Sequence, residues 1–288
     1  MRTYRLVILS LLLLAACNPG WYYPQLDWLL PMYISDYVSL ASVQKNELGK
    51  RLKQQLAWHC QTQLPAYAGF LRSVGKNFES QDHIISEQQF QAYYTILRGY
   101  WKDVMVRIAP DAADLLISAS DEQIEELFRN IEERNQELED LYVNPPLADI
   151  HRNRADRMSE RLEKWIGKID AEQQRLVREW SYRPGSESTR WMANRRHLQQ
   201  AFRDLLSERR TDPAFKQQFV NLLISPETLR SESYKALVAE QTRLTLSLLA
   251  RIAASLSTEQ QRHFQETLAS LAGDFDRLAC PDPRTVSR

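Results

Sequence analysis

The spacing of apolar residues is helical along most of the chain. Between residues 121 and 141 the apolar positions are Ile124, Leu127, Phe128, Ile131, Leu138 and Leu141. The same spacing appears at Met158, Leu162, Trp165, Ile166 and Ile169, and again at Leu176, Val177 and Trp180. Apolar residues three or four positions apart lie on one face of an α-helix, which is the face that becomes buried. The pattern predicts nine or ten helices and no strand.

A short polar pattern marks where these helices begin. Ser or Asp follows an apolar or small residue, and Gln comes three positions later, at Ser86 and Gln89, Ser120 and Gln123, Asp170 and Gln173, and Ser257 and Gln260. A degenerate copy is Ala41-Ser42-Val43-Gln44. In a capping box the Ser or Asp oxygen accepts from a backbone N–H, and the Gln side chain reaches back to the cap residue. Each cap is expected to stabilise its helix by about 1 kcal/mol.

Prolines mark expected breaks or kinks between the helices, at Pro65, Pro110, Pro145-Pro146, Pro184, Pro213 and Pro226. The boxes are irregularly spaced, so the chain is not a strict solenoid repeat. Only 8 glycines occur in 288 residues, which disfavours tightly turning sheets and phosphate-binding loops. We therefore expect one elongated all-α domain over residues 26–280, followed by a flexible tail at 281–288.

The N-terminus has the pattern of a secretory signal. Arg2 and Arg5 flank the start of an apolar run at residues 6–14, and two alanines precede Cys17. This arrangement resembles the signal of bacterial lipoproteins, which implies cleavage of residues 1–16, acylation of Cys17 with palmitate-type chains, and a tether at 17–25. Asn18 follows the cysteine, and the same resemblance then implies the outer membrane, facing the periplasm. The alternative is a transmembrane anchor, but the apolar run is about half the ~20 residues that span a bilayer.

Charge limits the classes of partner. Without Arg2 and Arg5 the chain has 35 basic and 37 acidic side chains, which gives no reason to expect nucleic acid. Residues 121–140 hold nine acids and two bases, whereas residues 190–210 hold six bases and two acids. One interpretation is that such helix faces pair with one another across a bundle. The other is a basic binding face for lipid head groups, peptidoglycan peptides or an unfolded protein, at Arg190, Arg195, Arg196 and Arg203.

Two cysteines remain besides Cys17. Cys60 continues the apolar series of Leu48, Leu52 and Leu56, and Cys280 follows an apolar series that ends at Leu278. In an oxidising periplasm an even pair predicts a disulfide, which here would join the two ends of the domain. The alternative is two unpaired thiols.

Aromatic residues are dense between the predicted anchor and the first long helix. Trp21, Tyr22 and Tyr23 are followed closely by Trp28. Because Trp and Tyr favour the headgroup level, these residues could form an interfacial belt. The apolar density of residues 26–33 favours the second interpretation, an N-terminal arm that docks into the core.

The sequence shows no catalytic spacing. No two of His59, His83, His151, His197 and His263 stand three or four positions apart, and no Gly-x-Ser-x-Gly elbow occurs. His59 adjoins Cys60, which could form a thiol site, but a structural role beside a disulfide is the better interpretation. We expect no enzyme activity, metal or cofactor. A catalytic pair of carboxylates is the enzymatic alternative.

Three sequence blocks resemble a family of bacterial lipoproteins of unknown function (unknown-function family 6279). They lie at residues 26–38, 56–67 and 157–165. This resemblance implies a helical lipoprotein but no known activity. The repeated box is also similar to the Leu-Thr-x-x-Gln motif of the Spy/CpxP periplasmic chaperones, although helix capping alone explains it equally well. We expect a non-enzymatic binding, structural or chaperone-like lipoprotein. The alternatives are a peptidoglycan-acting hydrolase and an assembly subunit of an envelope complex.

Overall fold

The computed structural model describes residues 19–78, 85–182, 187–209 and 212–281. The predicted signal peptide, Cys17, Asn18, His83 and most of the predicted tail lie outside these residues. The described part contains ten α-helices of ten residues or more and no strand, which confirms the predicted all-α fold. Among the described residues, no helix combines the length and apolar character that crossing a membrane requires.

Two short elements precede the long helices, namely α2 (Pro19–Tyr22) and the 3-10 turn η2 (Tyr23–Gln25). The helices that follow are α3 (Leu26–Ser35), α4 (Ser42–Asn77), α5 (Glu87–Ile117), α6 (Asp121–Tyr142), α7 (Leu147–Ile166), α8 (Ala171–Ser181), α9 (Glu187–Ser207), α10 (Phe215–Ile224), α11 (Glu232–Ala254) and α12 (Thr258–Leu278). A second 3-10 turn, η3 (Pro226–Leu229), connects α10 to α11. Residues 19–25, expected as part of a tether, are therefore helical.

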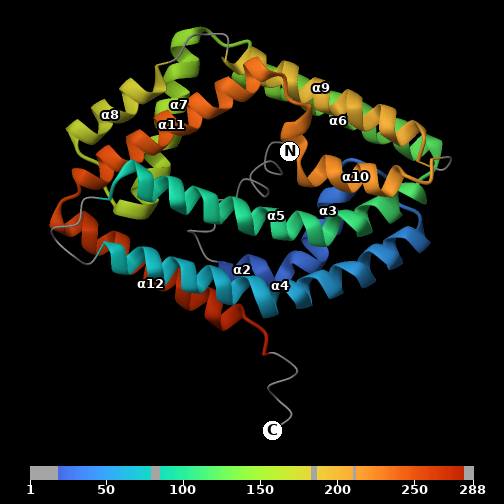
Figure 1. Ribbon diagram of the computed structural model, residues 1–288, viewed down its shortest axis with the longest axis horizontal. Coiled ribbons are helices and arrows are strands. Elements are labelled where there is room, and N and C mark those ends of the chain that lie inside the picture. Colours follow the sequence, from blue (N-terminus) through green and yellow to red (C-terminus); the bar gives the residue numbers. More distant parts are fainter. Residues whose placement is uncertain (1–18, 79–84, 183–186, 210–211, 282–288) are drawn as a thin grey trace.

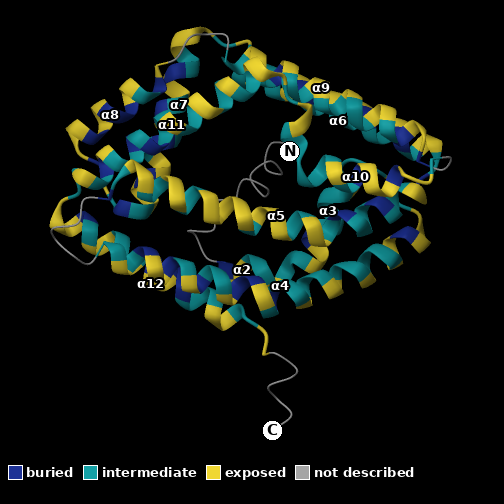
Figure 2. Ribbon diagram, viewed as in Figure 1, coloured by how far each residue is buried: buried dark blue, intermediate teal, exposed yellow. Residues whose placement is uncertain are grey.

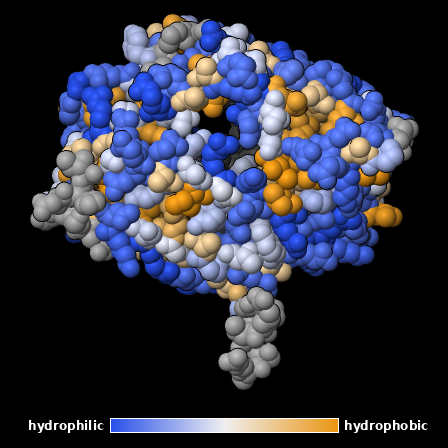
Figure 3. All heavy atoms as spheres, viewed as in Figure 1, coloured by the Kyte–Doolittle hydropathy of each residue, from blue (hydrophilic) through white to orange (hydrophobic). Residues whose placement is uncertain are grey.

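The helices form a flattened ring (Figure 1). α4 and α12 pack together along one side, and α5 runs beside α4. α7, α8 and α11 form one end, whereas α6, α9 and α10 form the other. The space-filling view, seen from the same side, shows a hollow at the centre of the ring (Figure 3).

Three apolar clusters stabilise the ring, one at each end and one along the side. The first joins α7, α8 and α11 through residues such as Leu162, Val177 and Leu248. The second joins α5, α6, α9 and α10, and the third joins α4 to α12. Trp165 and Phe264 contact both the first and the third cluster, so they connect one end of the ring to its side.

Of the predicted breaks or kinks, a break is excluded at Pro65 and Pro110, because Pro65 lies inside α4 and Pro110 lies inside α5. Each proline removes one helical hydrogen bond. The helices continue because packing fixes the residues beyond each proline. Ala68 is buried against α12, and Ala113 is buried in the cluster of α6, α9 and α10. Prolines 145, 146 and 213 do lie between helices, Pro226 begins η3, and Pro184 is outside the described residues.

Capping boxes form at four helix starts. The backbone N–H of the cap residue donates to the Gln side chain at Ser86, Ser120, Asp170 and Ser257, and each cap oxygen accepts in return. The degenerate copy differs, because Ala41 is the cap residue of α4 and has no side-chain oxygen. Only the Gln half remains there, with Gln44 Oε1 accepting from the Ala41 N–H at 2.8 Å.

Four of these glutamines also bond to one another across the fold. Gln173 Nε2 donates to Gln260 Oε1 at 2.9 Å, and Gln260 Nε2 donates to Gln173 Oε1 at 2.8 Å. Gln44 and Gln123 form the same reciprocal pair, at 3.0 and 2.8 Å. Gln173 is 0% exposed and Gln260 is 7% exposed. The pairs therefore join the start of α8 to that of α12, and the start of α4 to that of α6.

The ends of the domain are joined covalently. Cys60 of α4 and Cys280 form a disulfide, as predicted. The Cys280 N–H also donates to the carbonyl of Cys60 at 3.2 Å. A cysteine in a disulfide has no thiol, so the alternative of a thiol site at His59 and Cys60 is wrong.

Candidate functional site

α4 and α5 lie side by side and antiparallel, and three hydrogen bonds fix their register (Figure 1). Asn77 donates to the Tyr93 hydroxyl at 2.8 Å, and the Tyr100 hydroxyl donates to the Ala66 carbonyl at 3.2 Å. At the other end, Gln55 Nε2 donates to Asp111. Residues between these contacts are consequently matched in reverse order along the two helices.

A groove of about 560 Å³ lies between the two helices. Its lining combines amides, two carboxylates, one guanidinium and apolar side chains: Gln54, Gln55, Trp58, Gln63, Asp103, Val106, Arg107, Pro110 and Asp111. The outer side of α5 is open beyond this groove, because residues 95–99 are all exposed (Figure 2). The groove has a mixed polar and apolar lining, and we treat it as the candidate site.

Two amide oxygens in the groove have no hydrogen-bond partner among the described residues. They are Oε1 of Gln55 and Oε1 of Gln63, and both atoms are buried. The whole Gln63 residue is only 8% exposed. A buried acceptor without a donor destabilises a fold by about 1–3 kcal/mol.

A third acceptor arises from the proline in α5. Pro110 has no N–H, so the carbonyl of Val106, four residues earlier, loses its helical donor. Both residues line the groove. In the middle of the groove the Arg107 guanidinium lies 5.7 Å from the centre of the Trp58 ring. That distance is typical of a cation–π contact, so this face of Trp58 already accommodates a cation.

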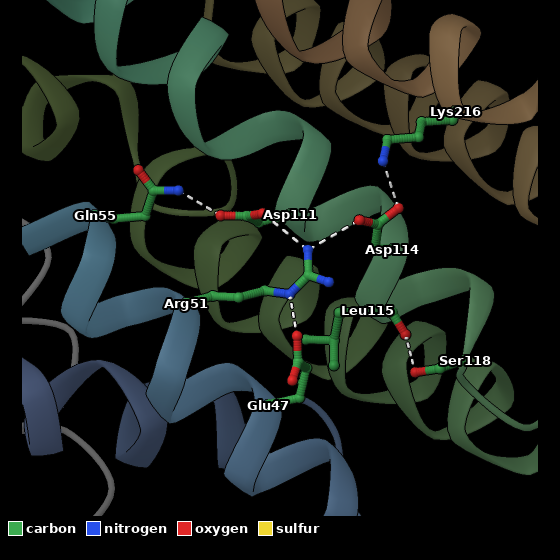
Figure 4. Close-up of polar contacts among 8 residues, drawn as sticks. All are labelled: Glu47, Arg51, Gln55, Asp111, Asp114, Leu115, Ser118 and Lys216. Carbon is green, nitrogen blue, oxygen red and sulfur yellow. Dashed lines mark hydrogen bonds and ion pairs between the residues drawn. The ribbon is translucent and has the colours of Figure 1, made fainter. Parts of the chain in front are cut away.

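An ion-pair network closes one end of the groove (Figure 4). Arg51 donates to Asp111 at 2.8 Å, to Asp114 at 2.9 Å and to Glu47 at 2.7 Å. Lys216 of α10 donates to Asp114 at 2.6 Å. Burial alone would raise the pKa of Asp114, but hydrogen bonds from Lys216 and Arg51 outweigh burial and lower it. The network therefore joins α4, α5 and α10, and it fixes Asp111 beside Gln55.

The N-terminal arm docks onto the core, as the second interpretation of its aromatic residues predicts. α2 packs against α12, and α3 packs against α4. The Tyr23 hydroxyl is hydrogen-bonded to His59 Nδ1 at 3.0 Å, next to the disulfide. Trp21 and Trp28 are nevertheless 58% and 52% exposed, so the docked arm keeps an open aromatic side.

Burial lowers the pKa of His59 from its usual 6.5 to about 4. The unfolded chain therefore takes up a proton at His59 between pH 6.5 and about 4, whereas the folded protein does not. Stability is expected to fall as the pH decreases through this window, by up to about 3 kcal/mol from this residue. Denaturant unfolding at pH 7, 6, 5 and 4 measures the fall. The variant His59→Gln is expected to show a shallower slope over the same window, and an unchanged slope would contradict the assignment.

Three of the four arginines of the predicted basic face contact α6. Arg196 pairs with Glu132 and Glu139 at 2.7 and 3.0 Å, and Arg203 pairs with Glu125 at 2.7 Å. Arg195 donates to the Asn135 side chain at 2.7 Å, and Arg190 is exposed. Two of the four residues, Arg196 and Arg203, thus follow the interpretation that the charged helix faces pair with one another, so we place no binding function on this face.

The box residues and histidines do not gather into one site. Gln44 bonds to Gln123, and Gln173 bonds to Gln260. The remaining box, at Ser86 and Gln89, only caps α5. Among the described residues, no three His, Cys, Asp or Glu side chains are grouped so that they could hold a metal ion. Sequence reasoning missed the groove. The one signal was Gln63, a polar residue beside the apolar face of the helix that contains Cys60.

Comparison with known proteins gives one match. A family model, described as a family of unknown function (DUF6279), matches residues 36–235. No curated protein and no solved structure matches the chain. The matched segment begins at the end of α3 and reaches into α11, so it includes both helices of the groove. Because the model matches more than half of the sequence, the chain belongs to this family of unknown function, DUF6279, as its sequence blocks predicted.

Proposed function

We propose that this protein is a lipid-anchored component of the bacterial cell envelope, facing the periplasm from the outer membrane, and that it acts by binding rather than by catalysis. The lipoprotein-type signal that ends at Cys17 supports the anchor. The disulfide between Cys60 and Cys280 supports an oxidising compartment.

The docked N-terminal arm is the main observation that supports attachment to the membrane. Cys17 precedes Trp21 by four residues, so an extended chain between them spans at most about 14 Å. An acylated Cys17 would therefore hold Trp21 close to the membrane surface. Trp21 of α2 and Trp28 of α3 lie on either side of the 3-10 turn η2, and both are exposed. Since tryptophan favours the headgroup level, the arm supplies both an anchor and a membrane contact.

Replacing Cys17 with Ser is expected to abolish acylation and with it the membrane anchor. Cells grown with radiolabelled palmitate measure the first effect, because the label on this protein should disappear. Envelope fractionation after a high-salt wash measures the second, because the variant should no longer behave as an outer-membrane lipoprotein. The matched control replaces Cys60 and Cys280 with Ala and should keep the label. Label retained on the Cys17→Ser variant would contradict the proposal.

A specific observation favours a second candidate, an assembly subunit of an envelope complex. Ile96, Leu97 and Trp101 of α5 are exposed, and so is Leu229 of η3. An ion pair between Arg98 and Glu227, at 3.7 Å, brings η3 near this part of α5. Figure 3 shows further apolar surface beside the central hollow, over α10. A chaperone-like role would use the same apolar surface, and suppression of aggregation in light scattering separates that role from capture of one fixed partner.

A further inference from the structure

The segment after α3 runs along α6 and brings the end of α3 to that helix. The Ser39 N–H donates to the Glu126 side chain at 2.8 Å. One helical turn further along α6, the Asn130 side chain donates to the Tyr37 carbonyl at 2.8 Å. Residues four positions apart lie on one face of a helix, so the next residue on this face is Arg134. Arg134 therefore lies beside the last turn of α3.

A second arginine reaches the same place from α9. Arg195 Nε donates to the side chain of Asn135, the neighbour of Arg134, at 2.7 Å. Burial raises the pKa of Tyr33, and the positive charges of Arg134 and Arg195 oppose this rise, so both guanidinium groups lie near the Tyr33 hydroxyl. That hydroxyl is hydrogen-bonded to the hydroxyl of Tyr37 at 3.2 Å. Two arginines and two tyrosines, from α6, α9 and the end of α3, therefore form one cluster.

The cluster has more positive than negative charge. Burial lowers the pKa of Arg195, and the other groups that act on its charge are the two tyrosines and Arg134. Among the described residues, no carboxylate pairs with Arg195. Arg134, in contrast, pairs with Glu137. One positive charge, that of Arg195, is therefore left without a balancing carboxylate in the described part of the chain.

The terminal nitrogens of Arg195 are free to bind. Neither Nη1 nor Nη2 has a hydrogen bond within the described ranges, and neither is a buried atom without a partner, so solvent reaches both. The two tyrosine hydroxyls share one hydrogen bond, which leaves one hydroxyl hydrogen without an acceptor among the described residues. Nη2 of Arg134 also lacks a partner, but it is buried, so it contributes charge and no contact. The free donors are thus two neighbouring N–H groups and one O–H group.

We propose that this cluster binds a singly charged group with two terminal oxygens, namely a carboxylate or a phosphodiester. The two Nη atoms of a guanidinium form a fork that matches two such oxygens, and the tyrosine hydroxyl supplies a third hydrogen bond. The one unbalanced positive charge matches one negative charge. The inference names a ligand class for the binding part of the proposed function, on which it rests, and it does not depend on the lipid anchor. Arg196 and Arg203 take no part, because acids of α6 already pair with them.

Isothermal titration calorimetry of the full chain in detergent, at low salt, tests the proposal with two soluble probes. Hippurate supplies a carboxylate, and glycerophosphoglycerol supplies a phosphodiester. We expect saturable binding of at least one probe, weakened at least tenfold in Arg195→Gln. The double variant Tyr33→Phe and Tyr37→Phe removes the third hydrogen bond and should weaken binding about fivefold. The matched control is Arg190→Gln, which removes the same charge from an exposed position of α9 and should leave the affinity unchanged.

Thermal unfolding followed by circular dichroism shows which variants are folded. If Arg195→Gln does not fold, Arg195→Lys replaces it, because lysine keeps the charge and loses the fork, and the same weakening is expected. Binding of hippurate alone would identify a carboxylate ligand, and binding of glycerophosphoglycerol alone would identify a phosphodiester such as that of a lipid head group. No saturable heat with either probe, or equal weakening by Arg190→Gln, would overturn the proposal. In each of these cases, palmitate labelling at Cys17 would still test the anchor separately.

Discussion

Replacing both Cys60 and Cys280 with Ala is expected to lower the free energy of unfolding by about 5 kcal/mol. The disulfide joins residues 220 positions apart, and the chain-entropy model assigns about this value to a loop of that length. A loss of this size should lower the Tm by more than about 10 °C. Thermal unfolding followed by circular dichroism, on the oxidised protein and on the double variant, measures the difference.

Reduction of the unmodified protein provides the control for this prediction. Its Tm under reducing conditions should approach that of the double variant, and reductant should not change the variant itself. The expected consequence is local as well as global, because the disulfide lies beside the Tyr23–His59 contact that docks the N-terminal arm. A double variant that melts together with the oxidised protein would show that packing of α4 against α12 alone closes the ring.

The second large effect is expected from the paired glutamines. Gln173→Ala should lower the free energy of unfolding by about 3 kcal/mol. It removes one half of the capping box of α8, worth about 1 kcal/mol, and leaves the buried amide of Gln260 without its partner, worth about 1–3 kcal/mol. Denaturant unfolding measures the loss. The matched control is Gln89→Ala, because Gln89 caps α5 in the same way without a reciprocal glutamine partner, and it should lose only about 1 kcal/mol.

A double-mutant cycle isolates the coupling between the two boxes. The variant with both Gln173→Ala and Gln260→Ala should be more stable than the sum of the single losses predicts, because neither amide is then left without the other. Equal losses for Gln173→Ala and Gln89→Ala would contradict the account, since they would reduce both residues to ordinary helix caps.

Helix starts could be predicted from the sequence because capping is local chemistry. Ser86, Ser120, Asp170 and Ser257 are the cap residues of α5, α6, α8 and α12, and each lies three positions before its glutamine. The start of α4 shows the limit of that reasoning. The degenerate copy has an alanine three positions before Gln44, so the cap has no side-chain oxygen and only the contact from the Ala41 N–H to Gln44 forms.

Interactions between distant segments could not be predicted from the sequence. Gln44 is 79 positions from Gln123, and Gln173 is 87 positions from Gln260, so no local pattern indicates that they meet. Pro65 and Pro110 were expected to break or kink helices, and they do not break them, because packing of the residues beyond them outweighs the lost hydrogen bond. The groove depends on the antiparallel register of α4 and α5, which brings Gln63 and Asp103 to the same end.

The disulfide could be predicted from the sequence only in part. The even number of cysteines besides Cys17 and the oxidising compartment that the signal implies predict a pair. Cys60 continues the apolar series of its helix, whereas Cys280 follows the apolar series of the last helix. The sequence alone did not decide the role of the acidic segment 121–140 and the basic segment 190–210. Their composition fits both a basic binding face and pairing across the bundle, and only the contacts of Arg196 and Arg203 with α6 separate the two.

The central claim is that this chain is an acylated envelope protein whose ring is closed by its disulfide. Mass spectrometry of the protein extracted from cell membranes, digested without reduction, tests it most directly. The account predicts an N-terminal peptide that begins at Cys17 and carries acyl chains, together with a linked peptide pair that contains Cys60 and Cys280. An N-terminal peptide that still includes residues 1–16, or a Cys17 without acyl chains, would contradict it.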